Sequence, residues 1–432
     1  MTTLSSTSSG FETSVPTKPS RLPAVFSVAL LTGGADRPYA FGLATALIAD
    51  GASLDLIAND ELDCESFHRA EGVNFLNLRG KQNPNTSIAK KALRVTLYYC
   101  RLIRYAARAR PPIFHILWNN KIEFFDRTFL MAYYRLLGKR LVLTAHNINA
   151  GKRDNTDSYF NRLTLAIQYR LCHHIFVHTE KMKRELIHDV SIPETRITVI
   201  PFGINNAVPN TALTSYGARQ RLGLSAGDRV LLFFGNIAPY KGLEHLIAAF
   251  RRVCSGHRNY RLIIAGRPKN CDQYWCRIRE DIATELKSGA VLLNADFIPD
   301  DETEVYFKAA DVVVLPYKHI YQSGVLFLAQ SFGSPVLAAD VGSLKDDITE
   351  GQTGFLFRPE DPVDLANAIN RYFTSDLYYN VARRRDDIRS RAAERHSWTI
   401  VSQLTMDRYA RILGLNSDTK TRDNETPAQV GG

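Results

Sequence analysis

Short apolar runs alternate with longer segments of helical periodicity along most of this 432-residue chain. Such alternation predicts parallel β-sheets that are covered by helices on both faces. We expect a first series of strands at 25–31, 53–58, 73–76, 113–117, 141–144, 175–177 and 198–201. After a polar, turn-rich stretch at 205–215, we expect a second series at 229–234, 261–265, 290–293, 312–315, 336–339 and 354–357. The chain should therefore form two similar α/β domains, each built on a doubly wound parallel sheet.

The segment 311–340 contains the clearest β-α-β unit of the chain. Its apolar strand at 312–315 is followed by a loop, and a helix opens near Ser323 and Gly324. In such a unit the free amides and the positive dipole end of the helix can hold a phosphate. Gln322, Ser323 and Gly324 are therefore a candidate phosphate site, although Gly324 has the alternative role of permitting a tight turn.

Two cationic side chains follow other strands of the second series. Lys241 lies in FFGNIAPYKG between the strand 229–234 and the next helix, and Arg267 follows the strand 261–265. A lysine or arginine at the mouth of a sheet can neutralise a diphosphate. Basic residues are common on loops, so neither residue is informative alone. Together with the helix start at Ser323 they predict an anion-binding pocket.

In the first half of the chain, Gly33 and Gly34 follow the first strand and precede a helix at 39–50. They let the backbone approach a ligand, but without the complete G-x-G-x-x-G pattern a dinucleotide is not indicated. His146 stands at the carboxyl end of the strand 141–144, where it can hydrogen-bond to a hydroxyl or a departing oxyanion; a structural histidine is the alternative. Three further histidines lack the spacing of a zinc site and are interpreted as structural, namely His173, His174 and His178.

The segment 87–112 is helical in pattern and unusually basic. It interleaves cations with apolar and aromatic residues, in the set Lys90, Lys91, Arg94, Arg101, Arg104, Arg108 and Arg110 among Leu93, Leu97, Tyr98 and Ile103. This pattern is typical of a helix that lies on anionic lipid, and we predict such a surface at 87–110. The alternative is a helix with one core face and one solvated face. Nucleic acid is not expected as a partner, because no binding module accompanies the charge.

Composition indicates an ordinary globular protein, with 45% hydrophobic residues and a formal charge of +10 that favours anionic partners. No apolar run reaches the roughly 18 to 20 residues of a membrane-spanning helix. The Ser/Thr-rich start predicts a disordered lead-in at 1–22 without a secretion signal, and a disordered tail is predicted at 415–432. We therefore expect a cytoplasmic protein. The cysteines are scattered and should be reduced thiols: Cys64, Cys100, Cys172, Cys254, Cys271 and Cys276.

Several catalytic motifs are absent from the chain. It has no G-x-x-x-x-G-K-S/T loop, which argues against a P-loop nucleotidase, and no G-x-S-x-G elbow. It also has no Asp-x-Asp triplet, so a catalytic divalent metal has no obvious carboxylate site. No metal site is predicted.

Six ordered motifs resemble the landmarks of family-4 glycosyltransferases. They are the Gly33-Gly34 loop, Thr144-x-His146, VIPFGIN at 199–205, FFGNIAPYKG at 233–242, the segment 322–336 and DVGSLKDDITEGQTGFLF at 340–357. The resemblance covers roughly residues 23–410. It implies the GT-B architecture, in which two Rossmann-like domains face across a cleft and the last helices cross back to the first domain.

The resemblance also implies domain limits and an activity. The acceptor-side domain would span 23–205, the nucleotide-sugar domain 206–385, and the crossover helix 386–414. Such enzymes move a sugar from a nucleoside-diphosphate sugar to a saccharide or lipid-linked acceptor in polysaccharide or glycoconjugate synthesis. They usually retain the anomeric configuration and need neither a metal nor another cofactor. For this chain, peripheral association with the inner face of the plasma membrane is expected through 87–110.

Residue roles follow from the same resemblance. Gly34 would approach the donor phosphates, His146 would contact the transferred sugar, and Lys241 would hold the diphosphate together with Arg267. The expected catalytic residues are His146 and Lys241. The expected donor-binding residues are Gly33, Gly34, Asn236, Lys241, Arg267, Gln322, Ser323, Gly324 and Val325.

The chain departs from the family pattern at two places. The arginine that commonly accompanies the lysine is replaced by Asn236 or, in another alignment, by Ala238. The paired glutamates that many members use for the sugar and the ribose fall at about Ile320 and Leu328. A catalytically inactive, glycosyltransferase-like nucleotide-binding or partner protein is therefore the alternative to an enzyme. A sugar-nucleotide epimerase of the same architecture is a third hypothesis.

Overall fold

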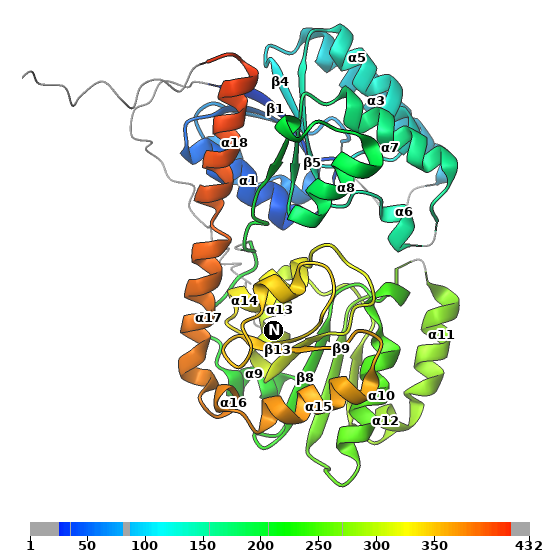
Figure 1. Ribbon diagram of the computed structural model, residues 1–432, viewed down its shortest axis with the longest axis vertical. Coiled ribbons are helices and arrows are strands. Elements are labelled where there is room, and N and C mark those ends of the chain that lie inside the picture. Colours follow the sequence, from blue (N-terminus) through cyan, green and yellow to red (C-terminus); the bar gives the residue numbers. More distant parts are fainter. Residues whose placement is uncertain are drawn as a thin grey trace, which may run out of the picture.

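The computed structural model describes residues 26–34, 36–80, 87–154, 156–205, 207–269 and 271–415. Within them the chain folds into two α/β domains that lie one above the other along the long axis of the molecule (Figure 1). Each domain is built on one parallel sheet, which confirms the two-domain prediction. The predicted lead-in at 1–22 and the predicted tail, apart from Leu415, lie outside the described residues.

The N-terminal domain contains a seven-stranded parallel sheet in the order β3-β2-β1-β4-β5-β6-β7. Its strands are β1 (Ser27–Leu31), β2 (Ser53–Ile57), β3 (Val73–Leu76), β4 (Ile113–Ile116), β5 (Arg140–Ala145), β6 (His174–Val177) and β7 (Ile197–Val199). The order runs outward in both directions from the β1/β4 pair. Loops at the carboxyl ends of β1 and β4 therefore diverge and leave room for a ligand.

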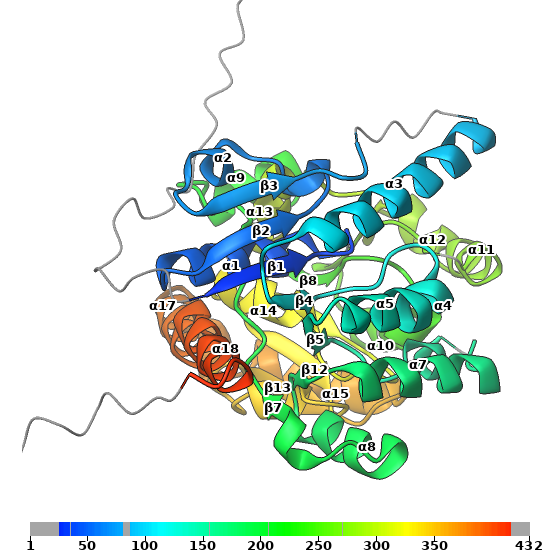
Figure 2. The same cartoon turned by 90° about the horizontal axis from the view of Figure 1, so that it is seen from above.

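Helices cover both faces of this sheet (Figures 1 and 2). One face packs against α1 (Arg37–Ala49), α2 (Glu65–Arg69) and α18 (Trp398–Ile412). The other packs against α3 (Ile88–Arg108), α5 (Met131–Leu136), α7 (Tyr159–Leu171) and α8 (Glu180–Val190). The short elements are η1 (Asp60–Leu62), α4 (Glu123–Phe125), the π-turn η2 (Asp126–Leu130), α6 (Ala150–Arg153) and η3 (Glu194–Arg196). Successive side chains of a strand point to opposite faces of the sheet. The apolar strands therefore contribute side chains to a core on each face.

The C-terminal domain has a six-stranded parallel sheet in the order β10-β9-β8-β11-β12-β13. The strands are β8 (Arg229–Phe234), β9 (Tyr260–Ala265), β10 (Val291–Asn294), β11 (Val312–Leu315), β12 (Val336–Ala339) and β13 (Gly354–Phe357). One core contains α10 (Leu243–Cys254), α11 (Asp272–Asp281), α15 (Pro362–Phe373) and α16 (Asp376–Tyr379), with α12 (Ala283–Lys287) at its edge. The other contains α9 (Ser215–Arg221), α13 (Asp300–Ala309) and α14 (Gly324–Ser331). The short turns η4 (Pro239–Lys241) and η5 (Leu344–Asp347) complete the domain.

The last two helices return the chain to the N-terminal domain, as predicted. α17 (Val381–Arg395) packs on α14, and α18 packs on α1 after a break at His396 and Ser397. The Trp398 indole donates to the carbonyl of Ile204 at 2.8 Å. It also covers Gly42 and Gly203, where any Cβ would clash with the ring. The crossover is therefore fastened to the linker between the domains.

Candidate functional site

A cavity of about 580 Å³ lies between the domains, where the carboxyl ends of strands in both sheets meet. The N-terminal domain contributes Arg153, Asp154 and Thr156, which follow β5. The C-terminal domain contributes Asn236, Ala238, Pro239, Tyr240, Lys269, Lys318, His319 and Glu360. The guanidinium of Arg153 lies 4.6 Å from the ring centroid of Tyr240, so the two domains touch at this point.

Lys241 is a buried cation next to this cavity. It ends η4, its residue is only 5% exposed, and its ammonium lies 5.5 Å from the ring centroid of Tyr317 and 5.8 Å from that of Phe233. No Asp or Glu of the described residues forms an ion pair with it. Burial, followed by the charges of Arg153 and Lys269, lowers the pKa of Lys241 from 10.5 to about 7. An anion bound here would restore the charge of the lysine.

The N-terminus of α14 is the second element of this site. The buried hydroxyl of Ser323 caps the helix by accepting from the amide of Leu326 at 3.3 Å. As the first residues of the helix, Gly324 and Val325 have amides without intrahelical partners. A Cβ on Gly324 would meet nothing within 4 Å, so the helix start faces open space. Among the described residues, none forms a hydrogen bond with the buried side-chain oxygen of Gln322.

Lys241 and α14 converge on Gly235, which directly follows β8. A Cβ at Gly235 would lie 3.2 Å from the Lys241 ammonium and 3.3 Å from a methyl of Val325. The Ser323 hydroxyl also lies 3.5 Å from that of Tyr317, whose ring contacts the lysine. The structure thus brings together a lysine and a helix start that are about eighty residues apart in sequence.

Asn236 and Arg267 are placed differently from each other. Asn236 is exposed and lines the cavity. Arg267 is exposed as well, with its guanidinium 5.7 Å from the ring centroid of Phe297. The cations whose charge acts on Lys241 are Arg153 and Lys269, which sequence reasoning missed. Lys269 could have been found, since it is on the same loop as Arg267. A role for Arg267 in binding stays a prediction.

His146 occupies the N-terminal side of the site. It follows β5 and stacks on Trp118, with ring centroids 4.0 Å apart and ring planes 3° apart. Its Nδ1 is 3.0 Å from Nε2 of His178, and its own Nε2 is buried and has no hydrogen-bond partner in the described part of the chain. Burial, and then the neighbouring His178 and His115, hold the pKa of His146 well below 6.5. His146 is therefore neutral at pH 7.

The tautomer of His146 follows from its neighbour. Burial lowers the pKa of His178 to about 4, so this ring is neutral as well. Nδ1 of His178 is 3.3 Å from the carbonyl of Ile200, which can only accept a hydrogen bond. Nε2 of His178 must then accept from Nδ1 of His146, which leaves a free lone pair on Nε2 of His146. His178, which was interpreted from the sequence as structural, thus determines that Nε2 of His146 is a hydrogen-bond acceptor.

Two aromatic rings connect this histidine to the C-terminal domain. Phe202 lies 6.0 Å from His146 and stacks on Phe327 of α14, with centroids 5.2 Å apart. The domains are also joined by the Tyr321 hydroxyl, which bonds to Glu185. The His146 side and the Lys241 side therefore belong to one interdomain region.

The Gly33-Gly34 loop has backbone φ values of +63° and +74°, which favour glycine. A Cβ on Gly33 would clash with the carbonyl of Trp118, and one on Gly34 would clash with Arg79. Arg79 also donates to the carbonyl of Gly33 at 2.6 Å. Contacts inside the domain therefore explain both glycines, and their approach to a bound phosphate stays a prediction.

The two positions aligned with the paired glutamates provide no polar group. Leu328 of α14 is buried in the core, and Ile320 packs against the same core. Recognition of a ribose or sugar hydroxyl through these side chains is excluded by their chemistry. Polar groups elsewhere in the cleft would have to replace them.

Family models match both halves of the chain. Residues 32–208 match "Glycosyltransferase Family 4", and residues 228–375 match "Glycosyl transferases group 1". The D-inositol 3-phosphate glycosyltransferase of Acidothermus cellulolyticus is 30% identical over 205 residues, which are 46% of this chain and 45% of that protein. An uncharacterized glycosyltransferase of Methanocaldococcus jannaschii is 24% identical over 85% of this chain and 92% of its own length. The chain thus spans about half of the first relative and nearly all of the second.

Solved structures share the fold. Sucrose-phosphate synthase of Thermosynechococcus elongatus superposes with a TM-score of 0.69 at 20% identity, covering 90% of this chain and 100% of that one. HepE of Anabaena, in complex with UDP and glucose, superposes with a TM-score of 0.67 at 18% identity, covering 89% and 100%. These likenesses show that the two-domain arrangement of this chain is the GT-B fold.

Proposed function

We propose that this chain, which belongs to the family-4 glycosyltransferases, transfers a sugar from a nucleoside-diphosphate sugar to a saccharide or lipid-linked acceptor. The observation that carries the proposal is the convergence of the buried Lys241 ammonium and the start of α14 on Gly235, beside the interdomain cavity. A buried cation without an acidic partner is costly unless a ligand supplies the anion. The diphosphate of a donor has the right charge and size.

The proposed role of this cluster is to stabilise the leaving diphosphate. Negative charge grows on the diphosphate as the bond to the sugar breaks, and fixed positive groups in a water-poor site stabilise it most effectively. Lys241 would be protonated in the complex, and the amides of Gly324 and Val325 would donate to phosphate oxygens. We propose that these groups make a metal ion unnecessary, and that the reaction proceeds with retention, as the family resemblance implies.

His146 would act on the sugar. Its free Nε2 lone pair can accept a hydrogen bond from a sugar hydroxyl, and its lowered pKa prevents it from serving as a general acid near pH 7. We therefore propose that His146 orients the transferred sugar. The N-terminal domain that carries His146 would also bind the acceptor.

The first experiment is a thermal-shift screen of uridine, guanosine and adenosine diphosphates and their sugars. A uracil donor is the first choice, because HepE is known in complex with UDP and glucose. We expect one nucleotide to raise the melting temperature, as a ligand of the native state must. The matching labelled nucleotide sugar is then incubated with the protein and a membrane extract. Absence of both binding and transfer across the panel would refute the proposal.

Because Ile320 and Leu328 are apolar, the alternative of an inactive nucleotide-binding or partner protein must also be tested. Binding without turnover over a broad acceptor panel would support that alternative. Conversion of the donor sugar without any acceptor would instead support an epimerase.

We further propose that the protein works in the cytoplasm against the inner face of the membrane, with the cations of α3 on anionic lipid. Within the described residues, none of the helices has the length and apolarity to cross a bilayer. A preference for vesicles that contain anionic lipid is the expected result. Equal binding to neutral vesicles would contradict a role for the α3 cations.

A further inference from the structure

The basic residues of α3 form fewer ion pairs than those of α17, in which three of the six arginines pair with acids. On α17, Arg384 pairs with Asp376 at 3.2 Å, Arg395 pairs with Asp347 at 3.6 Å, and Arg389 pairs with Asp386. On α3, none of the cations pairs with an acid of the described residues; they are Lys90, Lys91, Arg94, Arg101, Arg104 and Arg108. Three of them, with Arg110, line a surface hollow of about 670 Å³. This helix therefore presents positive charge that forms no ion pair with an acid of the described residues.

A cluster of exposed phenylalanines lies on the same domain, and sequence reasoning missed it. Phe124 of α4, Phe129 of η2 and Phe160 of α7 are 41%, 60% and 54% exposed. The ring centroid of Phe124 is 5.6 Å from that of Phe129 and 5.0 Å from that of Phe160. We call these three residues the aromatic patch. Contiguous exposed aromatic surface of this kind marks an interaction site, since water disfavours it.

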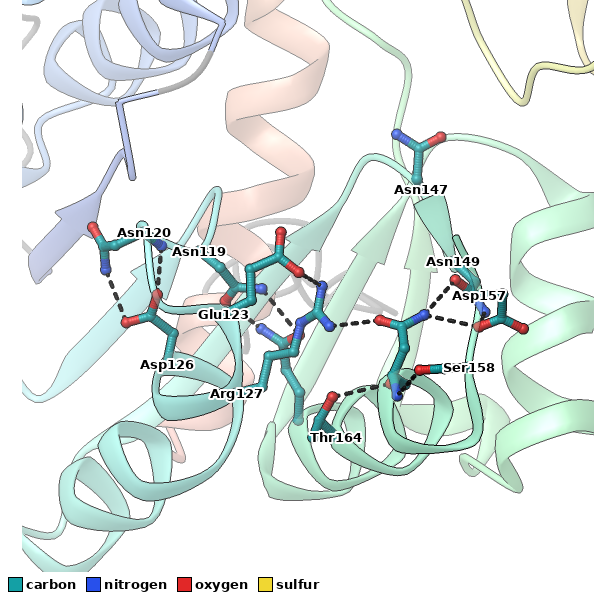
Figure 3. Close-up of polar contacts among 12 residues, drawn as sticks. Asn119, Asn120, Glu123, Asp126, Arg127, Asn147, Asn149, Asp157, Ser158 and Thr164 are labelled. Atoms are coloured by element: carbon teal, nitrogen blue, oxygen red, sulfur yellow. Dashed lines mark hydrogen bonds and ion pairs between the residues drawn. The ribbon is translucent and has the colours of Figure 1, made fainter. Parts of the chain in front are cut away.

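A polar network connects the elements that carry the aromatic patch (Figure 3). Arg127 bonds to Glu123 and donates to the amide oxygen of Asn161 at 2.8 Å. Asn161 in turn donates to Asn149 and Asp157, both at 2.9 Å. The network ties α4, η2 and α7 to the loop after β5. Hydrogen bonds therefore connect the elements on which the phenylalanines lie.

The elements that carry the patch pack on the same face of the N-terminal sheet as α3. In both views α3, α5 and α7 lie opposite α1 and α18 (Figures 1 and 2). Tyr99 of α3 donates to Asp126 at 3.1 Å, accepts from the amide of Ile122 at 3.0 Å, and packs against the ring of Phe125. Since α4 follows the carboxyl end of β4 and α7 follows that of β5, the patch stands on the cleft side of the domain.

We propose that the aromatic patch inserts into the interface of an anionic bilayer, with α3 lying alongside on the lipid headgroups. Aromatic rings and cations without a described acidic partner, on the same face of the sheet, match the apolar and anionic layers that a bilayer presents. A second copy of the chain is a poor occupant, because a two-fold contact through this side would bring two unneutralised cationic helices together.

This placement rests on the proposed function and deepens it. With the patch in the membrane, the rim of the cleft lies at the lipid surface. The acceptor would then be a lipid-linked saccharide that enters the cleft from the membrane, and the donor would enter from solvent. The aromatic patch would thus govern access to the acceptor and leave donor binding unchanged.

Vesicle co-sedimentation of the full chain tests the inference. The variant Phe129→Ser/Phe160→Ser is compared with the matched control Tyr216→Ser/Tyr379→Ser, which removes two aromatic residues that are 63% and 71% exposed on the C-terminal domain. On phosphatidylcholine vesicles with about 30% phosphatidylglycerol, the patch variant should lose at least about tenfold in partitioning, and the control should partition like the unmodified protein. Replacing Arg101, Arg104 and Arg108 by Gln should instead flatten the dependence on phosphatidylglycerol.

Equal partitioning of the patch variant and the unmodified protein would overturn the inference, and so would an equal loss in the control. A dimer that the patch variant converts to a monomer would assign the surface to a second copy. UDP binding is measured on every variant and should be unchanged. If no variant binds a nucleotide while vesicle binding behaves as expected, the proposed activity fails and the docking surface stands.

A fluorescence measurement covers the case in which the double variant is poorly folded. Phe160→Trp keeps an aromatic ring in the patch and adds a fluorescent reporter beside Phe124. Brominated lipid should quench its emission more strongly than that of a Tyr379→Trp control. Equal quenching of the two would contradict insertion.

Discussion

The two sides of the cleft each bury one basic side chain at a strand end, but they leave it in opposite states. On the C-terminal side, Lys241 is surrounded by Phe233, Tyr317 and a glycine, and no described acid neutralises it. On the N-terminal side, His146 is held by His178 through one nitrogen and is neutral. The first side lacks an anion, and the second side offers one hydrogen-bond acceptor. The cleft is therefore suited to a ligand that has an anionic group at one end and a hydroxyl group at the other.

The difference has an energetic origin. Burying a cation disfavours its charged form. In the ligand-free protein the charged form of Lys241 is therefore destabilised, and a bound anion would stabilise it. A neutral imidazole is far less costly to bury, and His178 satisfies one of its nitrogens. Changes on the Lys241 side should therefore affect anion binding, and changes on the His146 side should affect only the sugar.

The largest effect is expected for Lys241→Met. Loss of one charge that stabilises the leaving group should lower the transfer rate by about 10² to 10³-fold. UDP affinity should fall as well, while the melting temperature of the ligand-free protein should not drop, because the variant buries no charge. Single-turnover kinetics and calorimetry measure these quantities. Lys269→Met, at an exposed cation on the same rim, is the control and should cost much less; equal losses would show that Lys241 has no special position.

A smaller effect is expected for His146→Phe, which keeps a ring against Trp118 and removes the free lone pair. Loss of one hydrogen bond to the sugar should lower the transfer rate by roughly 10- to 100-fold and leave UDP affinity unchanged. His178→Gln, which retains an acceptor for Nδ1 of His146, should be milder than His178→Leu. A loss of UDP affinity in His146→Phe would remove the distinction between the two sides.

A pH dependence of UDP affinity is the third prediction. Lys241 has a pKa of about 7 in the free protein, and a bound diphosphate must raise it. Above pH 7 the complex therefore takes up a proton, and affinity should fall as the pH rises from 7 to 9, by at most about tenfold per unit. The diphosphate itself stays ionised in this range, since the second pKa of a phosphate is about 6. The dependence should vanish in Lys241→Met; its persistence there would place the titrating group elsewhere.

The smallest effect is expected on removal of divalent metal. If Lys241 and the start of α14 neutralise the diphosphate, EDTA should leave the transfer rate unchanged within about twofold. Rates before and after dialysis against EDTA, with Mg²⁺ added back, measure this. A rate that collapses and is restored by Mg²⁺ would show that the C-terminal side needs a metal to complete its charge.

Much of the fold could be predicted because local patterns carry it. The strands stand at the predicted places since a buried parallel strand is a short apolar run, and Ser323 caps α14 as its sequence position indicates. Lys241 could be placed beside a strand end by the same local reasoning. These features depend on a few neighbouring residues, so the chain order alone contains them.

Tertiary structure decided which of these groups meet and which remain without partners. Sheet order brings β5 beside β6, and only this pairing gives His146 its contact with His178. Domain packing sets Arg153 near Lys241 and leaves Arg267 beside Phe297. The phenylalanines of the aromatic patch look like ordinary core positions in the sequence, and folding leaves them outside. Proximity across long sequence separations depends on the whole packing of the chain, which local periodicity does not encode.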